Sequence, residues 1–191
     1  MGQQSIRTDG TDIVAVLRRD HVRIRTLLSA TPASAGRPDV ERWETFCQLS
    51  DLLVRHEVAE ELVVYPELAG LAGGTAVRRS RLVDQSDIEV LLVALDRQEF
   101  GSPGFEADIV QLGLRVLAHL EREESQVLPL LATFVEPDRR TRLGLRYLES
   151  VAIVGPSPSA TGVPSGPAVV DRTTAVSTFM RDSAGPSALV S

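Results

Sequence analysis

Residues 56–61 have the sequence HEVAEE, and residues 119–124 repeat its pattern as HLEREE. In each copy a histidine is followed four residues later by two adjacent glutamates, and a proline stands ten residues after the histidine: Pro66 and Pro129. Residues four apart lie on the same face of a helix, so the histidine and the first glutamate of each copy point the same way. The repeat therefore predicts two helices of one design, each presenting an imidazole and a carboxylate together.

The segments that precede the two copies also match each other. An acidic residue and a polar residue are followed by apolar residues at helical spacing, namely Asp20, His21, Ile24, Leu27 and Leu28 in the first segment and Asp84, Gln85, Ile88, Leu91 and Leu92 in the second. This spacing indicates helices with one buried face. The chain is thus predicted to contain two related helix pairs, and all three of its histidines occupy equivalent places in the duplication.

Apolar residues at helical spacing predict four long helices, over about residues 11–30, 39–69, 76–98 and 105–134. In the last of these helices the buried face is expected to continue from Glu123 through Gln126 and Leu130. Short connectors that contain Gly and Pro make consecutive helices antiparallel neighbours. The expected fold is therefore all-α, an up-down-up-down four-helix bundle.

The composition changes after the bundle. Pro137 begins a short fifth helix that is predicted to end near Ser150, and beyond it Pro, Gly and Ser become frequent while the apolar periodicity is lost. The tail is a candidate site for a protein partner. The expected organisation is an N-terminal arm over residues 1–10, the bundle over 11–135, an additional helix over 136–150 and a disordered tail over 151–191.

Charge and cysteine content exclude several classes of protein. The net charge of −6 argues against non-specific nucleic-acid binding, which needs clustered cations to displace phosphate counterions. The single cysteine cannot form an internal disulfide, which is consistent with a reducing compartment. No apolar run reaches the length needed to cross a membrane. We therefore expect a soluble, cytoplasmic protein.

The repeated glutamates Glu60 and Glu123 fall on predicted buried faces. A buried carboxylate without a partner costs on the order of several kcal/mol or becomes protonated, whereas a metal ion removes that cost. His56 and His119 lie on the same faces, and His21 adds a third imidazole. One histidine on an apolar face is more often a hydrogen-bonded core residue, but its duplication beside a glutamate favours a metal site. Carboxylates that bridge two irons, with terminal imidazoles, would use this set of residues.

Other metal sites fit the pattern less well. A ferritin-like site needs Glu-x-x-His twice, and the order and spacing are reversed in this chain. A zincin needs His-Glu-x-x-His, but Glu60 stands where its second histidine belongs. A thiolate site is excluded because the chain has one cysteine.

At these residues the chain resembles the haemerythrin-like family, also called the HHE cation-binding domain, over about residues 10–135. The resemblance implies a four-helix bundle that holds a non-haem di-iron centre with oxo or carboxylate bridges. Members of the family bind dioxygen, sense oxygen, iron or nitric oxide, or decompose peroxide. By position, the resemblance makes His21, His56 and His119 terminal ligands and Glu60 and Glu123 bridging ligands of iron, with no organic cofactor.

Two further positions of the family pattern bear on the metal ligands. Some members use the residue after the second-helix histidine as a ligand, which makes Glu57 a further candidate, whereas Glu61, Glu121 and Glu124 are expected on solvated faces. Gln85 stands where the family has histidine, and a neutral amide is a poorer ligand for iron. The second iron would then keep His119 and the bridges, and its site is open, completed by Glu57 or Glu89, or empty.

Two functions of different classes follow from these residues. The first is a non-haem iron protein that binds, senses or reduces a small oxidant such as dioxygen, peroxide or nitric oxide. The alternative is a non-catalytic interaction module whose degraded or mononuclear metal site only holds the helices together. The sequence does not choose between a carrier, a sensor and a peroxidatic enzyme.

Overall fold

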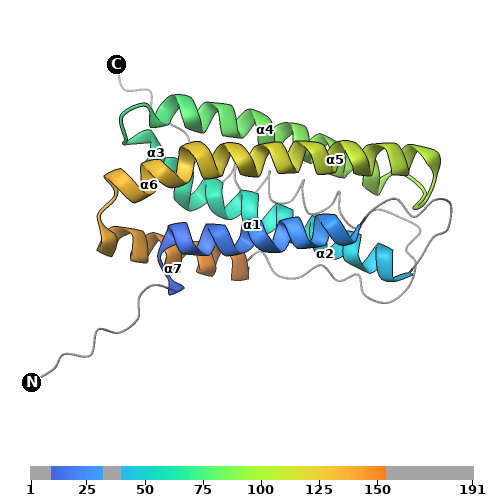
Figure 1. Ribbon diagram of the computed structural model, residues 1–191, viewed down its shortest axis with the longest axis horizontal. Helices are drawn as coiled ribbons and strands as arrows, with labels where there is room; N and C mark the ends of the chain where they lie inside the picture. Colours follow the sequence, from blue (N-terminus) through green and yellow to red (C-terminus); the bar gives the residue numbers. More distant parts are fainter. Residues whose placement is uncertain (1–9, 32–39, 154–191) are drawn as a thin grey trace, which may run out of the picture.

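The computed structural model describes residues 10–31 and 40–153, and all of the secondary structure in this part is helical (Figure 1). The elements, with η for a π-helical turn, are α1 (Ile13–Ala30), α2 (Val40–Ala59), η2 (Glu60–Val64), α3 (Tyr65–Ala69), α4 (Gly74–Asp96), α5 (Pro103–Arg122), η3 (Glu123–Val127), α6 (Leu128–Phe134) and α7 (Pro137–Ile153).

The four helices of the bundle are α1, the continuous run from α2 to α3, α4, and the continuous run from α5 to α6. Consecutive members run in opposite directions, as Figure 1 shows. The predicted all-α, up-down-up-down bundle is therefore confirmed. Most of the predicted disordered tail, from residue 154 onward, lies outside the described residues.

Local signals fix where the helices begin. The Asp12 carboxylate accepts a hydrogen bond from the backbone N–H of Val14 at 2.9 Å and caps α1. The Ser102 hydroxyl caps α5 in the same way by accepting from the backbone N–H of Phe105, and Pro103 occupies the first helical position, where no N–H is needed. Gly73, with a φ of 77°, supplies the left-handed turn that starts α4.

Both long helices that carry the repeat widen into a π turn at its glutamates. The backbone N–H of Tyr65 donates to the carbonyl of Glu60, and that of Leu128 donates to the carbonyl of Glu123, each across five residues. The next residue in each copy is the repeated proline, which has no N–H and clashes with the carbonyl of the preceding α-helical turn. Such single π turns occur frequently at functional sites.

The second π turn changes which residues are buried after Glu123. The extra residue in the turn rotates the following helix, so that Val127 and Leu131 are fully buried. Gln126 is exposed and Leu130 is only partly buried. The expectation that the buried face continues through Gln126 and Leu130 is therefore wrong, because it assumed an uninterrupted α-helix.

Two clusters of apolar side chains fill the bundle, one toward each end. The first contains Ile13, Leu17, Val64, Leu128 and Tyr147, and the second contains Ile24, Phe46, Leu53, Ile88 and Leu112. Six of the buried polar residues lie where the two clusters meet. They form a polar layer that consists of His21, His56, Glu60, Gln85, His119 and Glu123.

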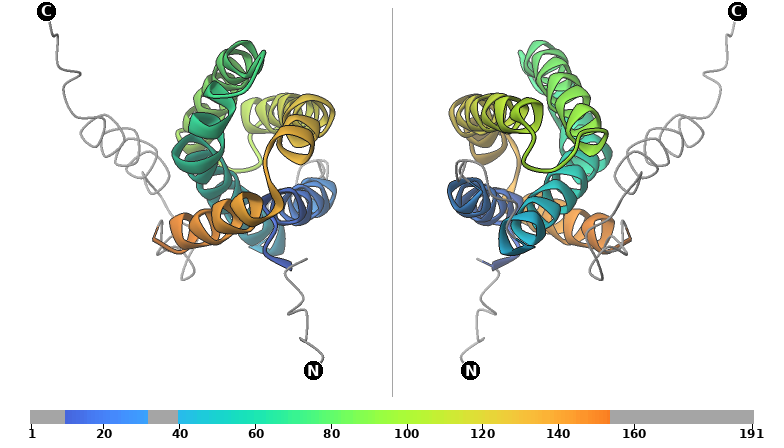
Figure 2. Two further views of the ribbon diagram at one scale, coloured as in Figure 1. Left: turned by 90° about the vertical axis from the view of Figure 1, so that its left-hand side faces the viewer. Right: turned by 90° about the vertical axis from the view of Figure 1, so that its right-hand side faces the viewer.

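The additional helix α7 packs outside the bundle against α1, α2 and η2 (Figure 2). It ends at Ile153, three residues beyond the predicted end. Its buried residues are Leu143, Gly144 and Tyr147. A Cβ atom on Gly144 would stand 1.9 Å from the carbonyl oxygen of Thr11, so glycine at this position permits the close approach of α7 to the start of α1. None of the helices within the described ranges combines the length and apolar character of a membrane span.

Candidate metal centre

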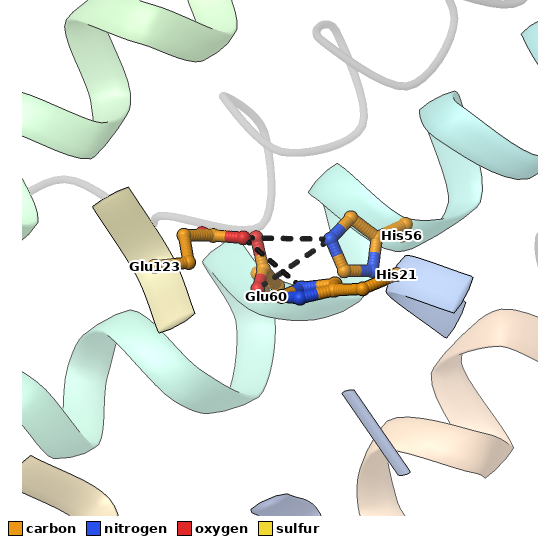
Figure 3. A group of neighbouring side chains, drawn as sticks. All are labelled: His21, His56, Glu60 and Glu123. Atoms are coloured by element: carbon orange, nitrogen blue, oxygen red, sulfur yellow. Dashed lines mark ion pairs between the residues drawn. The ribbon is translucent and has the colours of Figure 1, made fainter. Parts of the chain in front are cut away.

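Four side chains of the polar layer converge on one point in the middle of the bundle. His21 comes from α1, His56 from the last turn of α2, and Glu60 and Glu123 from the first residues of the two π turns. One ligand atom from each lies within 4.8 Å of the other three. Figure 3 shows the two imidazoles facing the two carboxylates. We call the space between these four side chains the first position.

The distances around the first position are those of unbonded neighbours. His21 Nε2 lies 3.3 Å from Glu123 Oε2. His56 Nε2 lies 3.7 Å from both Glu60 Oε1 and Glu123 Oε2. None of these four atoms has a hydrogen-bond partner among the described residues, although all four are buried. Buried polar atoms without partners are rare in folded proteins, and each requires an explanation.

The outer nitrogen of each imidazole at the first position is held by hydrogen bonds. His21 Nδ1 lies 3.0 Å from Glu124 Oε1, and a carboxylate can only accept, so Nδ1 carries the proton. The Tyr147 hydroxyl donates to Asp20 Oδ2 at 2.8 Å, so its oxygen accepts from His56 Nδ1 at 2.7 Å. In the neutral form of both rings, which metal binding requires, Nε2 then presents a lone pair to the first position.

In the deprotonated form that binds a metal, lone pairs therefore face lone pairs at the first position. Two imidazole nitrogens and two carboxylate oxygens point at one another in a buried space, and no described side chain donates a proton to any of these four atoms. A cation would turn this repulsion into attraction. Second-shell hydrogen bonds to the outer ring nitrogen are also typical of metal-binding histidines. The four residues consequently fit a bound metal ion.

His119 lies on the opposite side of Glu123, and its Nε2 is 3.4 Å from Glu123 Oε1. Its Nδ1 faces Asp84 Oδ2 at 3.7 Å, and Asp84 is held by Arg81 and Arg122. His119 is not part of the group of four. We call the space flanked by His119 Nε2, Glu123 Oε1 and Glu60 Oε2 the second position. Each carboxylate thus presents one oxygen to each position, as a bridging carboxylate would.

Hydrogen-bonding side chains occupy the second position. The Gln85 amide donates to Tyr65 Oη at 2.8 Å and to Glu60 Oε2 at 3.2 Å. The Tyr65 hydroxyl lies 3.2 Å from Glu60 Oε2 and 3.1 Å from Glu123 Oε1, and it donates to these carboxylates. The carboxylate oxygens are therefore satisfied at the second position and unsatisfied at the first. The duplicated sequence has produced two unequal positions.

The charges of the two carboxyl groups are unequal as well. Burial and the negative charge of Glu123 raise the pKa of Glu60 well above its usual range. Burial acts in the same direction on Glu123, but the charge of His119 and the neighbouring imidazoles of His21 and His56 hold the pKa of Glu123 well below its usual range. One carboxyl group therefore stays neutral in the metal-free site, because two adjacent buried negative charges repel each other.

The remaining sequence candidates lie beside the polar layer. Glu57 is buried next to His56 on α2, and its Oε1 has no hydrogen-bond partner among the described residues, but it is not part of the group of four. Burial and the nearby carboxylates of Glu123, Glu61 and Glu89 raise the pKa of Glu57 well above its usual range, despite the opposing charge of His56. Glu89 is likewise outside the group of four.

Several residues that hold the candidate ligands in place were not predicted from the sequence. Asp20 and Asp84 belong to the duplicated segments, and this repetition is the sequence signal that could have identified them. Glu124 was expected on a solvated face, but it is only 34% exposed and binds both His21 and Arg25. Tyr147 lies outside the repeat, so no pattern pointed to it.

The comparisons with known proteins support a metal-binding domain. A protein-family model described as "Hemerythrin HHE cation binding domain" matches residues 12–131, which include every residue of the polar layer and exclude α7. No curated protein and no solved structure matches the chain.

Proposed function

Because this chain belongs to the haemerythrin HHE cation-binding domain family, we propose that its polar layer binds iron and that the bound iron engages a small oxidant such as dioxygen, peroxide or nitric oxide. The observation that carries the proposal is the convergence of four buried ligand atoms without partners at the first position. Mixed imidazole and carboxylate ligands suit iron, manganese or zinc better than softer metals.

His21, His56, Glu60 and Glu123 would hold the metal at the first position. Their four donor atoms leave coordination positions open on an octahedral ion, and iron in such a site supplies redox chemistry and a place for a small ligand. The hydrogen bonds that Glu124 and Tyr147 accept from the Nδ1 atoms fix the rings so that Nε2 is the atom left to bind a metal in both histidines. The first position therefore needs little rearrangement to accept a metal ion.

The second position would bind a metal more weakly. Tyr65 and Gln85 already satisfy the carboxylate oxygens there, and His119 is the only imidazole that faces it among the described residues. A second ion would have to displace these hydrogen bonds and would gain one imidazole instead of two. We therefore propose one tightly bound iron, with a second iron bound only where the Tyr65 and Gln85 side chains give way.

The surroundings limit the substrate to small molecules. His21, His56, Glu60 and Glu123 are at most 1% exposed, so a bulky substrate does not reach them without opening the bundle. The Tyr65 hydroxyl accepts a hydrogen bond from Gln85 and lies between the two carboxylates. Its single proton is shared between these carboxylates, so a small oxygen-containing ligand that entered between Glu60 and Glu123 would compete with them for this hydrogen bond.

The alternative function is a structural metal site in an interaction module. The filled second position favours it, since a site with one metal could serve simply to join α1, the α2–α3 run and the α5–α6 run. The two functions differ in one observable property. Iron that engages an oxidant changes its optical spectrum when oxidant is added, whereas a structural ion such as zinc does not.

Removing the metal should destabilise the protein. A ligand present at 100 times its Kd stabilises the folded state by about 2.7 kcal/mol, which corresponds to about 5–10 °C in Tm for a domain of this size. We expect calorimetry to show that Tm falls by this order after chelation and returns when Fe(II) is added without oxygen. A Tm that changes neither on chelation nor on the addition of iron, manganese or zinc would contradict the proposal.

A further inference from the structure

The helix α7 lies beyond the family match, yet it supplies a contact to a candidate metal ligand. Its Tyr147 is fully buried, and the hydroxyl oxygen lies 2.7 Å from His56 Nδ1. The same hydroxyl donates to Asp20 on α1. Tyr147 therefore connects three helices, α1, α2 and α7, at the outer side of the His56 ring.

We infer that Tyr147 is a positioning residue of the metal centre and that, through it, metal binding and the docking of α7 stabilise each other. The inference rests on the proposed metal site. The Asp20 carboxylate can only accept, so the Tyr147 proton points to Asp20 and the oxygen lone pair points to His56. This chain of hydrogen bonds selects the His56 tautomer that leaves Nε2 free for the metal.

The position of Tyr147 within α7 determines which part of the helix would be stabilised by metal binding. The first half of α7 is anchored elsewhere, by ion pairs of Arg139 with Glu67 and of Arg140 with Asp12, each at 2.7 Å. Tyr147 is the last fully buried residue of the helix, and Ile153 at its end is 80% exposed. The segment 148–153 is therefore held in place mainly through Tyr147 and the half-buried Val151.

Coupling between two sites is reciprocal. If a docked α7 makes His56 a better ligand, a bound metal must strengthen the docking of α7 by the same factor. Metal occupancy would then be transmitted to the C-terminal end of α7, which leads into residues 154–191. Metal binding would in this way change how firmly a surface segment of the molecule is docked.

The first test compares metal affinities, measured by competition between the protein and a chelator for Fe(II) without oxygen. Second-shell hydrogen bonds to ligating histidines contribute about 10–100-fold to metal affinity, so Tyr147→Phe should weaken binding by that factor. Ser50→Ala is the matched control, because it also deletes a buried hydroxyl. The Ser50 hydroxyl lies on α2 and donates to the Phe46 carbonyl instead of contacting a candidate metal ligand. Its metal affinity should stay close to that of the wild type.

The second test begins with a measurement on the wild type alone, which remains decisive if Tyr147→Phe does not fold. Amide hydrogen exchange of residues 148–153 should slow when Fe(II) or Zn(II) is added to the wild type. In the Zn(II) form, nitrogen NMR of His56 should show a protonated Nδ1 that loses its hydrogen-bonded shift in Tyr147→Phe. A structural role alone would not produce this shift.

The possible results separate this inference from the proposed function. Wild-type protein that binds no metal would overturn both. Wild-type protein that binds metal, combined with unchanged affinity in Tyr147→Phe or unchanged exchange at residues 148–153, would overturn only the role of Tyr147 and α7.

Discussion

Glu60→Gln is expected to abolish the metal-dependent rise in Tm while leaving the metal-free protein at least as stable as the metal-free wild type. Glu60 supplies one oxygen to each position, so its replacement by a neutral amide removes a charged ligand from both. In the metal-free protein the same carboxyl group is buried against Glu123, and burial and this neighbour raise its pKa well above the usual range. An amide has nearly the same shape and adds no charge.

The opposite effects on the two forms make this variant informative. In the metal-free protein burial and Glu123 already favour the neutral form of the Glu60 carboxyl group, so an amide there removes little charge and should leave Tm unchanged or slightly higher. Tm should be measured with and without Fe(II). Glu61→Gln is the control, because Glu61 is adjacent in sequence but outside the group of four, and it should keep the metal-dependent rise. Equal losses in both variants would show that Glu60 has no special role.

Gln85→His is expected to produce the second largest effect, an increase in the number of tightly bound metal ions. The substitution restores an imidazole at the position that the duplication makes equivalent to His21. It also removes the amide that donates to Tyr65 and Glu60, which frees a carboxylate oxygen at the second position. Imidazole binds first-row metals more strongly than a neutral amide does, so occupancy of the second position should approach that of the first.

Metal content per chain and the optical spectrum measure this effect. Gln126→His is the control, because Gln126 lies on the same bundle but is exposed and contributes no side chain to the polar layer. It should leave the metal content unchanged. Wild-type protein that already holds two equally tight metal ions, with no change in Gln85→His, would show that the two positions are equivalent.

The fold could be predicted because its signals are local and repeated. The spacing of apolar residues placed all four helices of the bundle, and the resemblance to the haemerythrin-like family is confirmed by the family match. The π turns were not predicted, although Pro66 and Pro129 were visible in both copies. A proline in an apparently continuous helix can be accommodated by a kink, by a break or by a widened turn, and the sequence does not distinguish between these.

The candidate site could be predicted only as far as the repeat extends. His21, His56, Glu60 and Glu123 were candidates because they recur at helical spacing, and the structure brings their ligand atoms together. Their roles as ligands stay a prediction. Tyr147 was not foreseen, since its contact with His56 joins residues 91 positions apart and follows no local pattern. Glu124 was assigned to a solvated face because helical phase alone does not show that α1 approaches it.

Metal analysis of wild-type protein purified from iron-supplemented cells, with an optical spectrum recorded before and after reduction, is the most direct measurement. The unpartnered ligand atoms at the first position predict that the protein retains iron, with about one tightly bound ion per chain, and that its spectrum responds to added oxidant. Protein that contains no iron, manganese or zinc, and that takes up none of them when they are supplied, would contradict a metal-binding role for the polar layer.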